Sequence, residues 1–174
     1  MVNPDVLSQP QYEPVFEKNI EMPMRDGTIL RANVTRPNAA GSFPILLERS
    51  PYNKDGGSEI AVGAPEFFAR RGYAVVIQDV RGRFASDGEF YPFKDDGAGV
   101  LRDGYDTIEW LATQPWCNGD IGTIGGSYSG ATQYQAALSR PPHLRAMFVR
   151  ESSADYQREW VYRDGAFELG FSLY

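Results

Sequence analysis

The sequence predicts an α/β fold with a mostly parallel sheet and an antiparallel hairpin before it. From residue 43 onward, short apolar runs alternate with helix-forming segments in the order strand, helix, strand. This alternation requires right-handed crossovers, which make neighbouring strands parallel and place helices on both faces of the sheet. Ahead of these segments, two strand-like stretches flank the turn Arg25-Asp26-Gly27, a pattern typical of a hairpin.

The individual elements have recognisable boundaries. Residues 1–15 are polar and proline-rich and are expected to lie extended on the surface, followed by the hairpin over residues 16–37. Gly72 is expected to end a short helix, and Asp103 is expected to be the N-cap of the next one. The expected elements after the hairpin are, in order, a strand (43–52), a helix (64–72), a strand (73–80), a helix (103–116), a strand (121–125), a helix (128–139) and a strand (144–151).

A long loop rich in glycine and aspartate is expected at residues 81–99. It belongs either to the functional site or to the scaffold. As a structural loop, it would be held by an ion pair in which Asp79 or Asp87 binds Arg81 or Arg83. We assign it no catalytic role.

The stretch "IGTIGGSYSGAT", residues 121–132, places a serine between glycines at the end of a strand. One interpretation is a phosphate-binding P-loop, since Gly125 and Gly130 have the right separation and Thr132 stands where a magnesium ligand would. A P-loop also needs a lysine at position 131 to reach the phosphates, and this chain has Ala131 there. Because this lysine is missing, a phosphate site is the least favoured interpretation of the stretch.

The other interpretation is a nucleophilic serine on a sharp turn from strand to helix. Such a turn needs small residues around the serine, and Gly125, Gly126 and Gly130 supply them around Ser127. The generic motif has its second glycine two residues after the serine, where this chain has Ser129. Gly130 must therefore provide the close packing one position later.

Composition excludes several classes of function. The chain of 174 residues has 17 basic and 23 acidic side chains, a net charge of -6 and a pI near 4.8, which is the wrong sign for a nucleic-acid binder. The single cysteine, Cys117, makes no intrachain disulfide, and no metal-ligand spacing is present, so no metal or cofactor is expected. No signal peptide and no apolar run of about 18 residues are present, so we expect a cytoplasmic protein without a membrane partner.

Four further stretches carry a family resemblance: "RSPYNK", "QDVRGRFASDGEF", "DGYDTIEWLATQPWCNGDIGTIGGSYSG" and "PPHLRAMFVRES". In this order they resemble the cocaine esterase and Xaa-Pro dipeptidyl-peptidase group of α/β-hydrolases (CocE/NonD-type hydrolases), of which this chain would be the N-terminal part. The resemblance implies that residues 1–150 are the N-terminal part of the hydrolase domain, cut after its sixth strand. It implies that residues 151–174 begin a helical cap.

The resemblance and the motif together suggest roles for four residues. Ser127 is the candidate nucleophile, and the backbone N–H of Tyr128 is a candidate oxyanion donor at the start of the following helix. The resemblance assigns the second oxyanion donor to the hydroxyl of Tyr52. It also aligns Trp160 with an aromatic of the acyl pocket, with a local spacing one residue short, and core packing explains Trp160 equally well.

The general base is missing from this assignment. The only histidine, His143, is separated from Ser127 by a helix of about a dozen residues, which spans roughly 18 Å toward the opposite edge of the sheet. A base must come within about 3 Å of the serine hydroxyl. The resemblance places the triad Asp and His after the nucleophile, beyond residue 174, so no residue of this chain is assigned to either role.

The expected function is therefore hydrolysis of carboxylic esters or amides, including acyl esters, amino-acid esters or Xaa-Pro peptides, through an acyl-enzyme on Ser127. The expected partners are a small-molecule substrate and the missing C-terminal part. The isolated chain should be nearly inactive, and an unpaired strand at the cut edge favours self-association. The alternative is a catalytically silent fragment or a non-catalytic α/β binding module.

Overall fold

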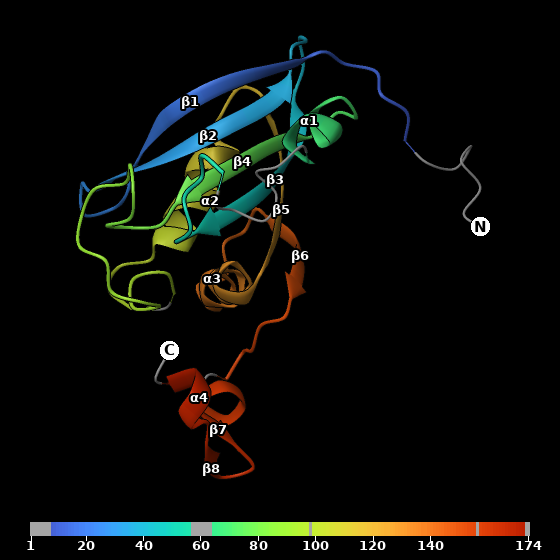
Figure 1. The fold of residues 1–174 in the computed structure, drawn as a ribbon. Helices are drawn as coiled ribbons and strands as arrows, with labels where there is room; N and C mark the ends of the chain where they lie inside the picture. The colour runs from blue at the N-terminus through green and yellow to red at the C-terminus, as the bar shows by residue number, and fades with distance from the viewer. Residues whose placement is uncertain (1–7, 57–63, 98, 156, 173–174) are drawn as a thin grey trace, which may run out of the picture.

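The computed structural model describes residues 8–56, 64–97, 99–155 and 157–172. Its main feature is a twisted six-stranded sheet with helices on both faces (Figure 1). The elements are β1 (Pro14–Pro23), β2 (Ile29–Pro37), β3 (Phe43–Ser50), α1 (Ala64–Ala69), β4 (Ala74–Asp79), α2 (Asp103–Ala112), β5 (Cys117–Gly126), α3 (Ser127–Leu138), β6 (Leu144–Arg150), the π-helix η2 (Gln157–Val161), β7 (Tyr162–Arg163), β8 (Ala166–Phe167) and α4 (Leu169–Ser172).

The strands lie in the order β1-β2-β4-β3-β5-β6. The predicted hairpin is confirmed, because β1 pairs with β2 antiparallel. β2 also pairs with β4 antiparallel, and all later neighbours are parallel: β4 with β3, β3 with β5, and β5 with β6. The predicted fold class is therefore confirmed, and the fifth strand ends immediately before Ser127.

The two faces of the sheet have separate apolar clusters. Ile108 and Leu111 of α2 join the larger cluster, which contains Val76 of β4. Phe68 of α1 joins a smaller one built on Val75 and Ile77. Consecutive residues of a strand point to opposite faces, so α1 covers one face of the sheet while α2 and α3 cover the other. The buried members of the larger cluster are Met22, Met24, Leu30, Ala32, Val34, Ile45, Leu47, Ala74, Val76, Ile108, Leu111, Ile121 and Ala136.

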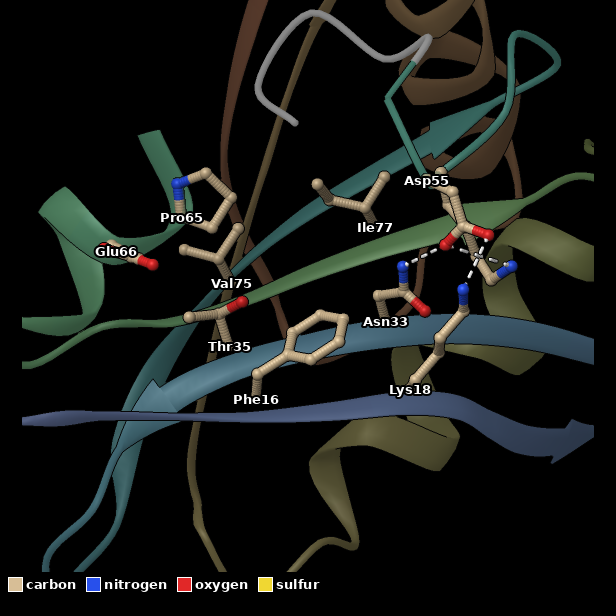
Figure 2. A pocket seen from close by; sticks show the side chains of 10 residues that line it. Phe16, Lys18, Asn33, Thr35, Asp55, Pro65, Glu66, Val75 and Ile77 are labelled. Atoms are coloured by element: carbon tan, nitrogen blue, oxygen red, sulfur yellow. Dashed lines mark hydrogen bonds and ion pairs between the residues drawn. The ribbon is translucent and has the colours of Figure 1, made fainter. Parts of the chain in front are cut away.

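The α1 face contains a hollow of about 360 Å³ over β1, β2 and β4. Figure 2 shows its apolar wall, which includes Phe16 and Val75, and a polar end where three side chains meet. At that end, Asn33 Nδ2 donates to an oxygen of Asp55 over 2.8 Å, and Lys18 pairs with the other oxygen over 3.0 Å. The side chains of Asn33, Lys18 and Asp55 are therefore hydrogen-bonded or ion-paired with one another.

The expected N-cap at Asp103 is wrong. α2 begins at Asp103, and its N-cap residue is Arg102, which makes no side-chain capping bond. The buried Asp103 carboxylate instead accepts two hydrogen bonds from Arg81, over 2.8 and 2.7 Å. Arg81 also donates to Asp26 in the hairpin turn over 2.8 Å, so one guanidinium joins the hairpin to α2.

The ion pairs expected within the 81–99 loop are also wrong. Asp79 pairs with Lys54 over 3.1 Å, and Asp87 pairs with Arg31 over 2.6 Å. Arg83 donates instead to the carbonyl oxygen of Pro51 over 3.1 Å. Arg31 lies on β2, whereas Lys54 and Pro51 lie in the segment after β3, so the side chains of Asp79, Asp87 and Arg83 bind other parts of the chain and not one another.

Residues 157–172 form a small unit of the π-helix η2, the two-residue strands β7 and β8, and α4. β7 and β8 form an antiparallel hairpin, with Tyr162 beside Phe167. In Figure 1 this unit follows an extended connection from β6 and lies apart from the sheet. The assignment of residues 151–174 to the start of a helical cap stays a prediction.

The Arg81 network predicts a pH dependence of stability. The hydrogen bond from Arg81 lowers the pKa of Asp26 from its ordinary 3.8 to about 2. Because the pKa is lower in the folded state, the stabilisation is present above pH 3.8 and is lost as the pH falls toward 2. Asp26→Asn should therefore lower the free energy of unfolding at neutral pH.

The measurement is urea unfolding of wild type and Asp26→Asn between neutral pH and pH 2. We expect the difference in unfolding free energy to shrink below pH 3.8. A difference that stays constant over this range would contradict the role of the ionised carboxylate. Asp120→Asn is the control, because Asp120 also pairs with an arginine but is about half exposed.

Candidate active site

The turn between β5 and α3 holds Ser127 in a strained conformation. Its φ is +51°, in the left-handed region that serine rarely adopts. The preceding Gly126 is extended, with φ of −114° and ψ of 171°, so the chain reverses its direction within two residues. Ser127 is exposed at the first position of α3. This is the local geometry of a serine presented at the edge of a sheet.

Two glycines make this turn possible. A Cβ on Gly125, whose φ is +147°, would lie 2.6 Å from the Cβ of Ser129. A Cβ on Gly130 would lie 2.6 Å from the Cβ of Ser152 and 3.1 Å from the carbonyl oxygen of Arg150. The two 2.6 Å distances are too short for a Cβ, so the close packing of α3 against the segment after β6 depends on glycine at position 130.

Ser129 occupies the position where the generic motif has glycine. Its side chain is buried, and its hydroxyl donates to Oε1 of Glu48 on β3 over 3.1 Å. The serine is tolerated because it finds a partner beneath the turn, while the close approach is moved to Gly130. This agrees with the sequence interpretation that Gly130 provides the packing.

Tyr52 and Tyr128 lie side by side at the same edge of the sheet. Tyr52 follows β3, whose residue Leu47 lies in parallel register with Thr123 of β5, so both strands end near Ser127. The Tyr52 and Tyr128 ring centroids are 6.4 Å apart, edge to face, and Tyr52 is 45 % exposed. The structure thus brings together the elements that carry Ser127, Tyr128 and Tyr52.

Phe93 was not predicted for this site. Its ring stacks on Tyr128 with centroids 4.2 Å apart, and its backbone N–H donates to Tyr128 Oη over 3.0 Å. Phe93 itself has a φ of +62°, an outlier for a bulky residue. The sequence signal that could have found Phe93 is the presence of aromatic residues in the otherwise polar 81–99 loop. Phe90, from the same loop, also lies near Tyr128, with ring centroids 6.3 Å apart.

Trp160 reaches this cluster through Phe93. The two ring centroids are 6.4 Å apart at an interplanar angle of 61°. The structure therefore places Trp160 beside the aromatic group that covers Tyr128. A contribution to an acyl pocket stays a proposal.

The loops around Tyr52 are held by the fully buried Asp79. Its carboxylate accepts the backbone N–H groups of Lys54 over 2.9 Å and Ala85 over 3.2 Å. The ammonium group of Lys54 pairs with the same carboxylate over 3.1 Å, and the Ser86 hydroxyl donates to the Asp79 carbonyl. The loops that follow β3 and β4 are thereby fixed to each other.

His143 lies at the opposite edge of the sheet. Its carbonyl oxygen accepts the N–H of Ile121, six residues before Ser127 along β5, which corresponds to roughly 20 Å of strand. Its ring nitrogen Nδ1 lies 2.8 Å from Glu109 Oε2 on α2. The structure agrees with the exclusion of His143 as the base.

Three further features of the described part of the chain bear on its chemistry and its location. Cys117 is a free, half-buried thiol, and burial raises its pKa, which makes it less reactive. The described ranges contain no group of three or more histidine, cysteine or acidic side chains that could hold a metal ion. None of the helices in these ranges is long and apolar enough to cross a membrane.

The order of the strands and the serine turn at the end of the fifth strand define an α/β-hydrolase fold. The sequence profile of the X-Pro dipeptidyl-peptidase (S15) family matches residues 26–174. The chain therefore belongs to this family, as the sequence motifs indicated.

Individual relatives support the assignment. The chain is 44% identical over 154 residues to cocaine esterase of Rhodococcus sp. (strain MB1 Bresler), covering 87% of this chain and 26% of the relative. A CocE/NonD family hydrolase from Staphylococcus aureus matches with a TM-score of 0.68 at 35% identity, covering 77% of this chain and 27% of that one. An α-amino acid ester hydrolase matches with a TM-score of 0.72 at 28% identity, covering 97% of this chain and 31% of that one. The chain spans about a quarter of the length of the curated relatives it matches.

The packing of α3 predicts the effect of one substitution. Gly130→Ala should destabilise the fold by about 1–3 kcal/mol, because the new methyl group meets Ser152 and a backbone carbonyl that cannot move freely. Urea unfolding measures the change. Gly170→Ala is the matched control, since Gly170 also lies in a helix and has nothing within 4 Å of its Cβ position. Equal stabilities for the two variants would show that α3 can shift away from β6.

Proposed function

We propose that this chain carries the nucleophile and the oxyanion-binding groups of a serine hydrolase that cleaves carboxylic esters or amides. Ser127 Oγ would attack the acyl carbon, its proton would pass to a base and then to the leaving group, and water would later release the acid. The strained, exposed Ser127 is the observation that carries this proposal. A left-handed non-glycine residue costs about 1–3 kcal/mol, and such strain gathers at functional sites.

Charge that develops on the acyl oxygen would be stabilised from two sides. The first N–H groups of a helix have no partner within the helix, and the helix dipole makes this end positive, so the Tyr128 N–H at the second position of α3 is suited to an oxyanion. The hydroxyl of Tyr52 would be the second donor. The contact between the Tyr52 and Tyr128 rings supports a shared site.

The aromatic residues near the turn favour a substrate with an apolar or aromatic acyl group. Phe93 stacks on Tyr128, and Trp160 contacts Phe93. Flat apolar surfaces of this kind bind aryl groups through offset or edge-to-face contacts. Of acyl esters, amino-acid esters and Xaa-Pro peptides, we therefore favour acyl esters with an aromatic acyl group.

The base and its orienting acid would come from polypeptide outside these 174 residues. The chain has one histidine, and it is bound to Glu109 at the far edge of the sheet. The longer relatives offer the additional sequence from which a triad could be completed. Without the base, the serine hydroxyl stays protonated and weakly nucleophilic.

The first experiment measures intact mass and maps peptides after exposure to a fluorophosphonate probe. The bare chain should stay unmodified. A chimera should be labelled at Ser127 when residues 1–174 are joined to the part of the Rhodococcus cocaine esterase that follows the matched segment. Ser127→Ala in the chimera should abolish labelling, whereas Ser129→Ala should keep it, because the Ser129 hydroxyl is buried against Glu48.

Two results would contradict the proposal. An adduct on the bare chain would show that a base lies within it, and a folded chimera that stays unlabelled would show that Ser127 is not a nucleophile. Cooperative unfolding of the chimera establishes that it is folded.

The proposed oxyanion donor has its own test in the chimera. Tyr52→Phe removes only the hydroxyl and should lower kcat for an aryl ester by about 10²–10³-fold, the usual cost of one such donor. Tyr73→Phe is the control, since Tyr73 is also partly exposed but packs against Phe68 of α1. Unchanged kcat in Tyr52→Phe would remove Tyr52 from the oxyanion hole.

A further inference from the structure

Arg83 binds the backbone next to Tyr52, the proposed second oxyanion donor. Its Nε donates to the carbonyl oxygen of Pro51 over 3.1 Å. The same peptide group is bonded at its other end, because the N–H of Tyr52 donates to the hydroxyl of the buried Ser50 over 3.1 Å. A peptide group is planar, so these two bonds fix the plane that contains the Cα of Tyr52. Arg83 thus supplies one of the two bonds that hold the backbone at Tyr52.

The backbone of Arg83 is itself held by the end of β4. Its N–H donates to the carbonyl oxygen of Val80 over 3.1 Å, which closes a turn directly after the strand. Further along, the N–H of Ala85 donates to the buried carboxylate of Asp79 over 3.2 Å. The Arg83 side chain therefore extends from a fixed segment, and its hydrogen bond ties the loop that carries Tyr52 to the end of β4.

The guanidinium of Arg83 also lies over two aromatic rings. Its Cζ is 5.0 Å from the ring centroid of Phe84 and 5.1 Å from that of Phe90. A planar guanidinium stacks on aromatic faces, and such contacts restrict its orientation. Phe90 in turn lies beside Tyr128, with ring centroids 6.3 Å apart. Arg83 thus contacts groups next to both proposed oxyanion donors.

The Tyr52 side chain depends on its backbone for its position. The side chain is 45 % exposed, and its ring meets that of Tyr128 edge to face, with centroids 6.4 Å apart. A half-exposed ring is not enclosed by packing, so the place of its hydroxyl follows the peptide group from which it extends. Oxyanion donors act at about 2.7–3.1 Å, which leaves little tolerance for displacement.

We propose that Arg83 is a positioning residue, which fixes the Tyr52 hydroxyl where the oxyanion forms. This inference rests on the proposed function, because Arg83 acts on the reaction only through Tyr52. Arg83 does not touch the substrate in this role. Loss of its side chain misplaces the Tyr52 hydroxyl without removing it.

The first measurement concerns the arrangement alone and needs no activity. In the 174-residue chain, nuclear Overhauser effects between the rings of Tyr52 and Tyr128 report their contact. Arg83→Met should weaken these effects, because methionine keeps a long side chain but loses the donor that binds Pro51.

Arg71→Met is the matched control. Nε of Arg71 also donates to a backbone carbonyl, that of Ser8 over 3.0 Å, and its guanidinium also lies over a ring, that of Phe67. Arg71 precedes β4, whereas Arg83 follows it, so the two arginines lie at opposite edges of the sheet. Arg71→Met should leave the tyrosine contact and kcat unchanged.

The second measurement is a double-mutant cycle on kcat in the chimera. Arg83→Met should lower kcat for an aryl ester by about 10–100-fold, since a displacement of about 1 Å can cost 10²-fold. KM should stay within about twofold, because the hydroxyl stabilises charge that forms only in the transition state. In the Tyr52→Phe background, where no hydroxyl is left to position, Arg83→Met should change kcat by less than about twofold.

Two outcomes would overturn this inference. One is an equal loss of kcat in both backgrounds, which is the signature of a merely structural role. The other is a contact between Tyr52 and Tyr128 that survives Arg83→Met. Failure of the proposed function gives a different result: the chimera stays unlabelled, while the ring contact in the 174-residue chain still responds to Arg83→Met.

A second variant covers the case in which Arg83→Met does not fold. Arg83→Lys keeps the positive charge and a donor but lacks the planar guanidinium that stacks on Phe84 and Phe90. It should lower kcat less than Arg83→Met does, and again only when the Tyr52 hydroxyl is present. Urea unfolding establishes that each variant is folded.

Discussion

The close approach of α3 to the chain after β6 is the constraint on which the serine turn depends. Gly130 leaves no room for a Cβ beside Ser152, and Gly125 leaves none beside Ser129. This packing holds the start of α3 close to the sheet, and Ser127, which connects β5 with the helix, has a left-handed conformation. Buried packing elsewhere in the fold offsets this local strain.

A second constraint fixes what surrounds the turn. Asp79 is fully buried, and a buried carboxylate is costly unless it is paired and hydrogen-bonded. Here Lys54 and two backbone N–H groups satisfy it, and these groups come from the loops after β3 and β4. The carboxylate therefore positions loops more than it adds stability. Tyr52 lies in one of these loops, and Phe93 lies further along the other.

The sequence was sufficient for features that depend on local patterns. Alternating strand and helix signals predicted the parallel sheet, and the glycine spacing around Ser127 predicted the turn. The sequence was not sufficient where the role of a side chain depends on a partner far away in the sequence. Asp103 has the chemistry of an N-cap, but its carboxylate binds Arg81 from another segment. Phe93 lies in a loop without periodicity, so the sequence shows an aromatic residue in a polar loop but not that it contacts Tyr128.

The same distinction separates the position of Ser127, the proposed nucleophile, from its activation. The groups that hold Ser127 in place lie within β5, α3 and the residues just after β6, so this stretch can form the turn without a base. A base must be brought to the hydroxyl by a separate part of a fold, and His143 is held at the opposite edge by Glu109 and by its backbone bond to Ile121. The strain at Ser127 is thus independent of proton transfer. Under the proposed function, the turn is a preformed site whose chemistry depends on groups added from outside this chain.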